Sequence, residues 1–272
     1  MITKYIAGKN ISQAILRGSQ IIAKNKIPVI NYAIENTNNH RDTYREYQNI
    51  VSNIDEKFRI ALKLSSFGFD LKLVKKIIDR AVVKNIKILI DAEENDNNEL
   101  YQNSVNSLIC RYNKKSPMIL KTYQMYRKDS LLNLQKDIND FQDYKLGTKM
   151  VRGAYWNSEH NQGHLFTNKI DTDTSYNMGL VTLSKHNKNS TNILATHNKS
   201  SISWGAMINK KHDTSIFEFG HLLGMREKTY NKMQNNIYPI NVYIPYGPYR
   251  EMLPYLSRRL YENLDMIKYA FT

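Results

Sequence analysis

Cysteine, glycine and long apolar runs are all scarce in this 272-residue chain. The single cysteine, Cys110, cannot form an internal disulfide. No stretch approaches the roughly 20 apolar residues that cross a bilayer, and the first residues, MITKYIAGKNISQ, lack the apolar segment of a secretory signal. These absences exclude an integral membrane protein. They predict an intracellular protein that is soluble or only peripherally associated with a membrane.

Acidic residues are also in short supply, with 25 against 39 lysines and arginines, which leaves a net charge of +14. Such a charge suggests nucleic-acid binding, but a nucleic-acid binder usually gathers its cations on one face or in a tail. Here the longest basic clusters are scattered pairs: Lys75-Lys76, Lys114-Lys115 and Lys210-Lys211. The joint abundance of Asn, Ile, Tyr and Lys is typical of an AT-rich coding sequence. We therefore favour a solvated basic surface and expect no nucleic-acid partner.

What the chain does contain is an alternation of apolar, β-branched runs with amphipathic stretches. The runs predict strands at residues 27–34, 58–65, 86–91, 118–123, 148–152, 192–196, 216–219 and 241–244, and the stretches that start at Asp70, Glu99 and Ser130 predict helices. Strands that alternate with helices indicate a parallel sheet, and eight such units predict an α/β fold, a (β/α)8 TIM-type barrel. The 11 glycines include no GxGxxG motif, which disfavours a doubly wound sheet.

The residues before the first strand, 1–26, contain a helical pattern, ISQAILRGSQIIAKN, which predicts an extra N-terminal helix packed on the barrel. A further helix is predicted after the last strand, packed over the barrel mouth. No internal repeat, low-complexity tract or linker divides the chain. We therefore expect one domain over residues 1–272.

The ends of the predicted strands are polar, and in such barrels the active site lies at the carboxyl ends of the strands. Buried polar groups need partners, and a ligand is one candidate. The strand-end residues are Lys63, Asp91 with Glu93 and Glu94, Gln124, Lys149 with Arg152, Thr196-His197-Asn198, and Tyr243 with Tyr246. By themselves, His197 is more often a hydrogen-bonded strand-end histidine than a catalytic base, and Tyr243 and Tyr246 are most often packing aromatics.

The segment YLSRRLYEN places Tyr255, Arg258 or Arg259, and Glu262 on one helical face. Two guanidiniums could clamp a carboxylate, but spacing alone favours an exposed Arg–Glu pair. Other constellations are weaker. His160 and His164 lack the glutamate of a zinc-protease motif, so no metal site is predicted, and no GxSxG elbow supports a hydrolase.

Seven blocks resemble the proline dehydrogenases, FAD-dependent barrel enzymes, and together they span about three quarters of the chain. They are ALKLSSFG from Ala61, ILIDAEEN from Ile88, KTYQMYRKD from Lys121, KMVRGAYWNSE from Lys149, ATHN from Ala195, EFGHLLGM from Glu218, and VYIPYGPYREMLPYLSRRLYEN from Val242. They follow the order of the family, each on a different predicted strand or on the last helix.

The resemblance implies a flavin across the barrel mouth and a role for each matching residue. The implied catalytic residues are Asp91 and Lys149. The implied substrate-binding residues are Lys63, Tyr243, Tyr255, Arg258 and Arg259, with the cations on the proline carboxylate. The implied cofactor-binding residues are Gln124, Val151, Arg152, Gly153, Ala154, Trp156, Thr196, His197, Leu222 and Glu262, the last of which would also hold the final helix in place.

The implied reaction is the oxidation of L-proline to Δ1-pyrroline-5-carboxylate by hydride transfer to flavin N5, the first step of proline catabolism to glutamate. Electrons would pass to a quinone-type acceptor, with peripheral membrane contact. Because the chain ends soon after the last helix, we expect a monofunctional enzyme. Two alternatives stay open: a methylenetetrahydrofolate reductase-like flavin barrel, and a non-catalytic basic barrel that binds nucleic acid.

Three positions bear on how closely the chain follows the family. Lys149 stands where bacterial members of the family typically have arginine. Eukaryotic-type members have lysine at this position, as this chain does. His221 stands where glutamine or arginine is commoner, which predicts an additional titratable group near the site. Tyr243 would crowd a 4-hydroxyl group, because relatives that prefer hydroxyproline have a small serine there. Proline is therefore the expected substrate.

Overall fold

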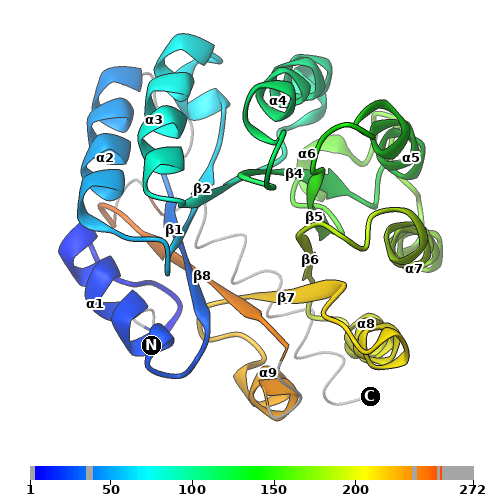
Figure 1. Cartoon of the computed structure of the whole chain (residues 1–272). Helices are drawn as coiled ribbons and strands as arrows, with labels where there is room; N and C mark the ends of the chain where they lie inside the picture. Colours follow the sequence, from blue (N-terminus) through cyan, green and yellow to red (C-terminus); the bar gives the residue numbers. More distant parts are fainter. Residues whose placement is uncertain (1–3, 35–38, 235–237, 250–251, 253–272) are drawn as a thin grey trace.

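A closed barrel of parallel strands forms the centre of the protein (Figure 1). The computed structural model describes residues 4–34, 39–234, 238–249 and 252. In that part of the chain the eight strands are β1 (Ile27–Tyr32), β2 (Arg59–Leu62), β3 (Lys87–Ile90), β4 (Ile119–Gln124), β5 (Gly147–Val151), β6 (Asn192–Ala195), β7 (Phe217–Leu222) and β8 (Ile240–Tyr246). The predicted (β/α)8 TIM-type barrel is confirmed, and each predicted strand is present.

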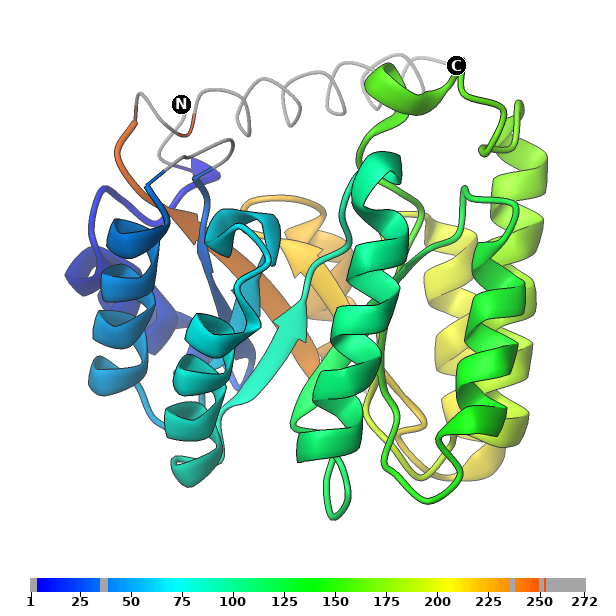
Figure 2. The ribbon, with the colours of Figure 1, turned by 90° about the horizontal axis from the view of Figure 1, so that it is seen from above.

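Helices surround the barrel and run alongside its strands (Figure 2). They are α2 (His40–Asn53), α3 (Leu71–Val83), α4 (Asn98–Tyr112), α5 (Ser130–Asp140), α7 (Lys169–His186), α8 (Lys199–His212) and α9 (Glu227–Gln234), and a short α6 (Trp156–Glu159) lies in the loop after β5. Within the described ranges, no helix is both long and apolar enough to cross a membrane. The predicted helix over the barrel mouth lies outside the described residues.

The predicted N-terminal helix is present as α1 (Ile11–Ile22). Its N-cap is Asn10, whose side chain accepts a hydrogen bond from the backbone N–H of Gln13 at 3.1 Å. Its buried residues, Ile11, Ala14, Gly18 and Ile21, recur every three or four positions and so form one face. That face packs on β1 and β8, and α1 lies between α9 and α2 in the ring of helices (Figure 1). The seam between the last and first strands is therefore covered by a helix from the start of the chain.

Two strand boundaries differ from the prediction in ways that affect the site. β2 ends at Leu62, and a 3-10 turn at Ser65–Phe67 follows, so Lys63 lies just beyond the strand. β7 continues to Leu222 instead of ending at Phe219, because Gly220, His221 and Leu222 pair with β8. The apolar run that defined this strand in the sequence stops before its pairing does.

The barrel interior changes character from one end to the other. At the amino ends of the strands, Arg59 forms a bidentate ion pair with Glu218, and its Nη1 also donates to Asn241 Oδ1 at 2.7 Å. An apolar layer follows, made of Val29, Ala61, Leu89, Leu120 and Ile193 with the ring of Tyr243. Beyond it, at the carboxyl ends, the side chains are polar again. The interior is thus a packed core with its reactive groups at the mouth.

Candidate active site

Three side chains from three strands meet in the barrel interior just below the mouth. Lys149 on β5 forms an ion pair with Asp91, which directly follows β3. The Lys149 ammonium also donates to the Tyr243 hydroxyl at 3.0 Å, and Tyr243 lies 3.4 Å from Asp91 Oδ1. The side chains of Lys149 and Asp91 are only 7% and 17% exposed. The structure therefore brings together two predicted catalytic residues and one predicted substrate-binding residue in a mostly dry environment.

Lys63 lies beside this cluster, after β2. Its ammonium is 5.4 Å from the centroid of the Tyr155 ring, within cation–π range. The Tyr155 hydroxyl donates to the carbonyl of Ala92 at 3.2 Å, which fixes the ring against the loop after β3. The sequence interpretation did not single out Tyr155, although it lies inside the GAYW block. Its role became visible only through a contact with a residue 92 positions earlier in the chain.

Glu93, also at the mouth, is a buried carboxyl group whose ionised form is stabilised by its neighbours. Burial raises the pKa of Glu93 above its ordinary value, while the backbone N–H of Ser65 at 2.9 Å and the charge of Lys63 oppose the shift. Its side chain is almost fully buried. Glu93 therefore adds a negative charge, or a proton when protonated, close to the Lys63 side of the mouth.

Gln124 links two loops at the mouth. Its amide nitrogen donates to the carbonyl of Glu93 at 3.1 Å, and its amide oxygen accepts from the N–H of Ala154 at 3.1 Å. The neighbouring Gly153 has φ +152, and a Cβ there would lie 2.4 Å from the Tyr126 ring. Glycine is therefore required for the loop after β5 to lie this close to β4.

Arg152, at the end of β5, joins three elements. Its Nε donates to Asp173 of α7 at 2.7 Å, its Nη2 donates to Ser201 of α8 at 3.1 Å, and its Nη1 donates to the hydroxyl of Thr196 after β6. Burial opposes ionisation of Asp173, but hydrogen bonds from Lys169 and Arg152 outweigh it and hold the pKa of Asp173 below its ordinary value. Arg152 and Thr196, both predicted to bind cofactor, are thus in direct contact.

A buried carboxylate holds the loop after β5 in place. Glu159, at the end of α6, is 1% exposed. Its Oε2 accepts from the Tyr126 hydroxyl and its Oε1 from the backbone N–H of Asn95, both at 2.6 Å. The loops after β3, β4 and β5 therefore share one anchor. Neither Glu159 nor Tyr126 was predicted as a site residue, because each acts through residues distant in sequence.

The other predicted cofactor-binding residues lie around the same mouth where the structure describes them. Val151 is the last residue of β5, Leu222 the last of β7, and His197 follows Thr196 after β6. Trp156 begins α6 and is 43% exposed, with its ring stacked on His160. Tyr255, Arg258, Arg259 and Glu262 lie outside the described residues. Among the described residues, no three His, Cys, Asp or Glu side chains form a metal-binding group.

His221 differs from its prediction. Phe217, Phe219 and His221 alternate along β7 with residues that face the barrel interior, so His221 points outward. Its ring stacks on Tyr230 of α9, with centroids 4.4 Å apart. Burial lowers the pKa of His221 to about 4. The additional titratable group expected near the site is therefore a buried packing residue that is neutral at physiological pH.

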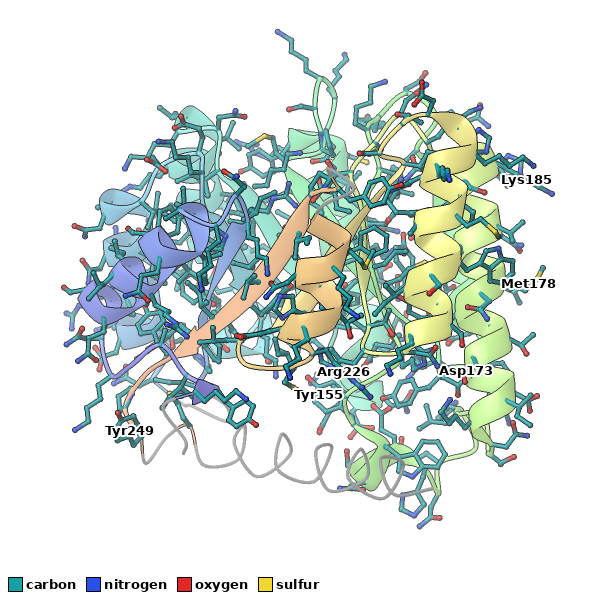
Figure 3. The ribbon with its side chains drawn as sticks, turned by 90° about the horizontal axis from the view of Figure 1, so that it is seen from below. Tyr155, Asp173, Met178, Lys185, Arg226 and Tyr249 are labelled. Atoms are coloured by element: carbon teal, nitrogen blue, oxygen red, sulfur yellow. The ribbon has the colours of Figure 1, made fainter. Side chains whose placement is uncertain are left out.

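Residues from distant parts of the chain gather at the mouth. Figure 3 shows Tyr155, Asp173, Arg226 and Tyr249 at one end of the barrel, whereas Met178 and Lys185 lie progressively farther along α7. α7 begins at Lys169, so its amino-terminal end, with Asp173, is at the mouth. Cations, tyrosines and carboxyl groups therefore lie around the Lys149–Asp91–Tyr243 cluster at the carboxyl ends of the strands.

A family model described as proline dehydrogenase matches residues 17–268. Among curated proteins, the chain is 32% identical to mitochondrial proline dehydrogenase 1 of Dictyostelium discoideum over 224 residues, 73% of this chain and 39% of that protein. It is 29% identical to proline dehydrogenase 2 of Bacillus subtilis over 234 residues, 82% of this chain and 72% of that protein. The chain therefore spans about two fifths of the length of the Dictyostelium relative.

A solved structure shares the fold. Proline utilization A from Bdellovibrio bacteriovorus, inactivated by N-propargylglycine, superposes with a TM-score of 0.84 at 20% identity, over 96% of this chain and 32% of that one. At this identity the likeness concerns the fold alone. It agrees with the barrel described above.

Proposed function

Because this chain belongs to the proline dehydrogenase family, we propose that it oxidises L-proline to Δ1-pyrroline-5-carboxylate with FAD as cofactor. The observation that carries the proposal is the Lys149–Asp91–Tyr243 cluster at the barrel mouth, where the fold places its reactive groups. The product would enter proline catabolism to glutamate. Electrons would pass to a quinone-type acceptor, through peripheral contact with a membrane.

The described residues suit a small amino acid as substrate. Lys63 supplies a cation for the carboxylate, and Arg258 and Arg259, outside the described residues, would complete that grip. The cations that bind the carboxylate also favour the unprotonated form of the substrate amine, because like charges repel. The amine must be unprotonated before a hydride can leave the neighbouring carbon. Tyr243 forms a wall and limits the space beside the substrate ring.

The donor groups at the mouth fit an anionic dinucleotide flavin. At Gly153 the loop after β5 presents backbone without a side chain, and Lys149 and Arg152 place positive charge beside this loop. The flavin, when bound, would accept the hydride and pass its electrons on. We propose that Gln124, Val151, Arg152, Gly153, Ala154, Trp156, Thr196, His197, Leu222 and Glu262 hold it. Lys149 would stabilise negative charge that develops beside it, because a fixed cation in a dry site needs no reorganisation.

Anaerobic titration tests this proposal. The purified protein should carry oxidised flavin absorbance, and L-proline should bleach it. Reoxidation by a soluble quinone, compared with oxygen, would then identify the class of acceptor. Flavin that no cyclic amino acid reduces would overturn the proposal. Bleaching by a reduced nicotinamide dinucleotide, followed by reoxidation with methylenetetrahydrofolate, would support the reductase alternative. Nucleic-acid binding that weakens steeply with salt and is unchanged by substitutions at the strand ends would support the non-catalytic barrel.

A further inference from the structure

Arg226 has an unusual backbone conformation. It lies in the loop between β7 and α9 with φ +51, in the left-handed region that non-glycine residues rarely adopt. Its carbonyl accepts hydrogen bonds from Thr229 at 2.9 Å and Tyr230 at 3.3 Å, at the start of α9. Asn25, Asn85 and Asp213 also have positive φ, but these residue types tolerate the conformation well. Among the described non-glycine residues, Phe69 (φ +58) is the other one of a type that does not. An arginine held there costs conformational free energy, and such strain concentrates at functional sites.

The guanidinium of Arg226 carries a second cost. Its Nε is buried and has no hydrogen-bond partner among the described residues. A buried donor left without an acceptor is unfavourable. Arg152 provides the contrast at the same mouth: it donates to Asp173, Thr196 and Ser201 and so is balanced by a carboxylate. Of these two arginines, Arg226 is therefore the one with a donor left for an anion.

The surroundings place Arg226 beside the predicted cofactor residues of β6. Tyr230, four residues later, donates to the carbonyls of Thr196 and Gly220. Burial and then Tyr176 raise the pKa of Tyr230, and the positive charges of Arg152 and Arg226 both oppose this shift. The two guanidiniums therefore act on one hydroxyl. Figure 3 shows Arg226 at the mouth, at the same end as Tyr155 and Asp173.

We propose that Arg226 binds a phosphate of the dinucleotide flavin, an inference that rests on the function proposed above. An oxyanion would accept the unpaired Nε donor and offset the positive charge that Arg226 adds beside Arg152. A phosphate fits better than the substrate carboxylate because of position. β2 and β3, which lead to Lys63 and Asp91, lie across the eight-stranded barrel from β6 and β7. Arg226 therefore serves the cofactor side of the mouth.

The test compares FAD with riboflavin, which has the same ring but lacks both the phosphates and the adenosine. The full-length protein is dialysed to equilibrium against graded FAD and, separately, graded riboflavin. In Arg226→Gly, glycine accepts the left-handed conformation without strain, so the loop keeps its path while the guanidinium is lost. We expect its FAD affinity to fall at least about tenfold, because charge-assisted hydrogen bonds to a phosphate are strong. Its riboflavin affinity should stay within about threefold of the unsubstituted protein. Arg226→Lys keeps the positive charge but loses the planar set of guanidinium donors. Its FAD affinity should lie between those of Arg226→Gly and the unsubstituted protein.

Two matched controls separate the causes. Asp213→Gly also places glycine at a position with positive φ, directly after α8. Lys228→Met removes an exposed positive charge from α9. Both should bind FAD as the unsubstituted protein does. Unchanged FAD affinity in Arg226→Gly would overturn the assignment, as would an equal loss of FAD and riboflavin, which would indicate a structural role. If the unsubstituted protein binds no FAD, the proposed function itself fails. If it binds FAD and Arg226→Gly binds equally well, only the role of Arg226 fails.

Discussion

At the scale of single residues, Tyr243 combines two contacts that depend on different parts of its side chain. The hydroxyl accepts from Lys149 at 3.0 Å, and the ring lies below the same ammonium with 4.8 Å between Nζ and the centroid. The side chain is 6% exposed and belongs to the apolar layer of the barrel. The ring therefore sets the space at the site, while the hydroxyl orients a cation.

These two parts can be separated by substitution. Tyr243→Ser removes the ring, so the kcat/KM for L-proline should fall while that for 4-hydroxyproline rises. We expect the ratio of the two values to change at least about tenfold, because a pocket that gains or loses a few heavy atoms changes substrate discrimination by about that much. Steady-state kinetics with both substrates measures it. Tyr243→Phe is the matched control: it loses the hydrogen bonds of the hydroxyl to Lys149 and Asp91, about 1 kcal/mol each, but keeps the ring and should still prefer proline. A preference that changes equally in both variants would show that the hydroxyl decides.

At the scale of elements, Arg152 holds the β5–α7–β6–α8 side of the barrel together. Its guanidinium contacts Asp173 on α7, Thr196 after β6 and Ser201 on α8, and its centre lies 4.5 Å from the Tyr176 ring centroid. These contacts align the first turns of two helices with the end of one strand. The side of the mouth for which we propose cofactor binding therefore depends on the ionised state of Asp173.

The pH dependence follows from the lowered pKa of Asp173. A carboxyl whose pKa is lower in the folded state contributes stability above its unfolded pKa, and loses it as the pH falls through the folded value. Chemical denaturation between pH 7 and pH 2 should therefore show stability falling below about pH 4, and Asp173→Asn should show a smaller fall. The matched control, Asp171→Asn, alters an exposed acid one half-turn away. If the free energy of unfolding of Asp173→Asn fell with decreasing pH as steeply as that of the unsubstituted protein, the role assigned to Asp173 would be wrong.

Most of the barrel could be predicted from the sequence, because each strand of a buried parallel sheet is a short run of apolar, β-branched residues. The same signal failed at the end of β7, where Gly220 and His221 interrupt the run although the pairing continues. The outward direction of His221 follows from the alternation that Phe217 and Phe219 begin, once the strand is known to extend that far.

The candidate site was predictable where residues occupy strand ends, as Asp91, Lys149 and Gln124 do. It was not predictable where the contact joins distant loops. Glu159 meets residues 64 and 33 positions earlier, and composition gives no sign of either pairing. Arg226 depends on a backbone angle, which a sequence does not show directly. Local pattern therefore locates the mouth, and the three-dimensional contacts define how its loops are held.

At the scale of the whole molecule, the net charge of +14 acquires a more specific meaning. Most of it is spread over the surface, but Lys63, Lys149, Arg152 and Arg226 lie at or near the mouth. Positive potential at the entrance of a site raises the local concentration of anions. A small carboxylate and a dinucleotide both carry the charge that this entrance attracts.

Closure of the barrel depends on a close contact at the start of the chain. Gly18 of α1 packs against Phe58, and a Cβ at position 18 would lie 2.3 Å from the Phe58 ring. Phe58 is 5% exposed and precedes β2, so it has little room to move. Because α1 covers the β1–β8 seam, the fit between these two residues bears on the whole closed sheet.

Gly18→Ala tests that fit with two effects of opposite sign. Alanine should stabilise the interior of a helix by about 1 kcal/mol relative to glycine, but overpacking a core costs about 1–3 kcal/mol, so we expect the free energy of unfolding to fall. Ser19→Ala, on the exposed face of the same helix, should instead be neutral or slightly stabilising, and both are measured by urea denaturation. Adding Phe58→Leu to Gly18→Ala should recover stability, because neighbouring substitutions that share one space are not additive. A Gly18→Ala protein more stable than the parent would mean that α1 can shift on the barrel, and the seam would then close without a close-packed helix.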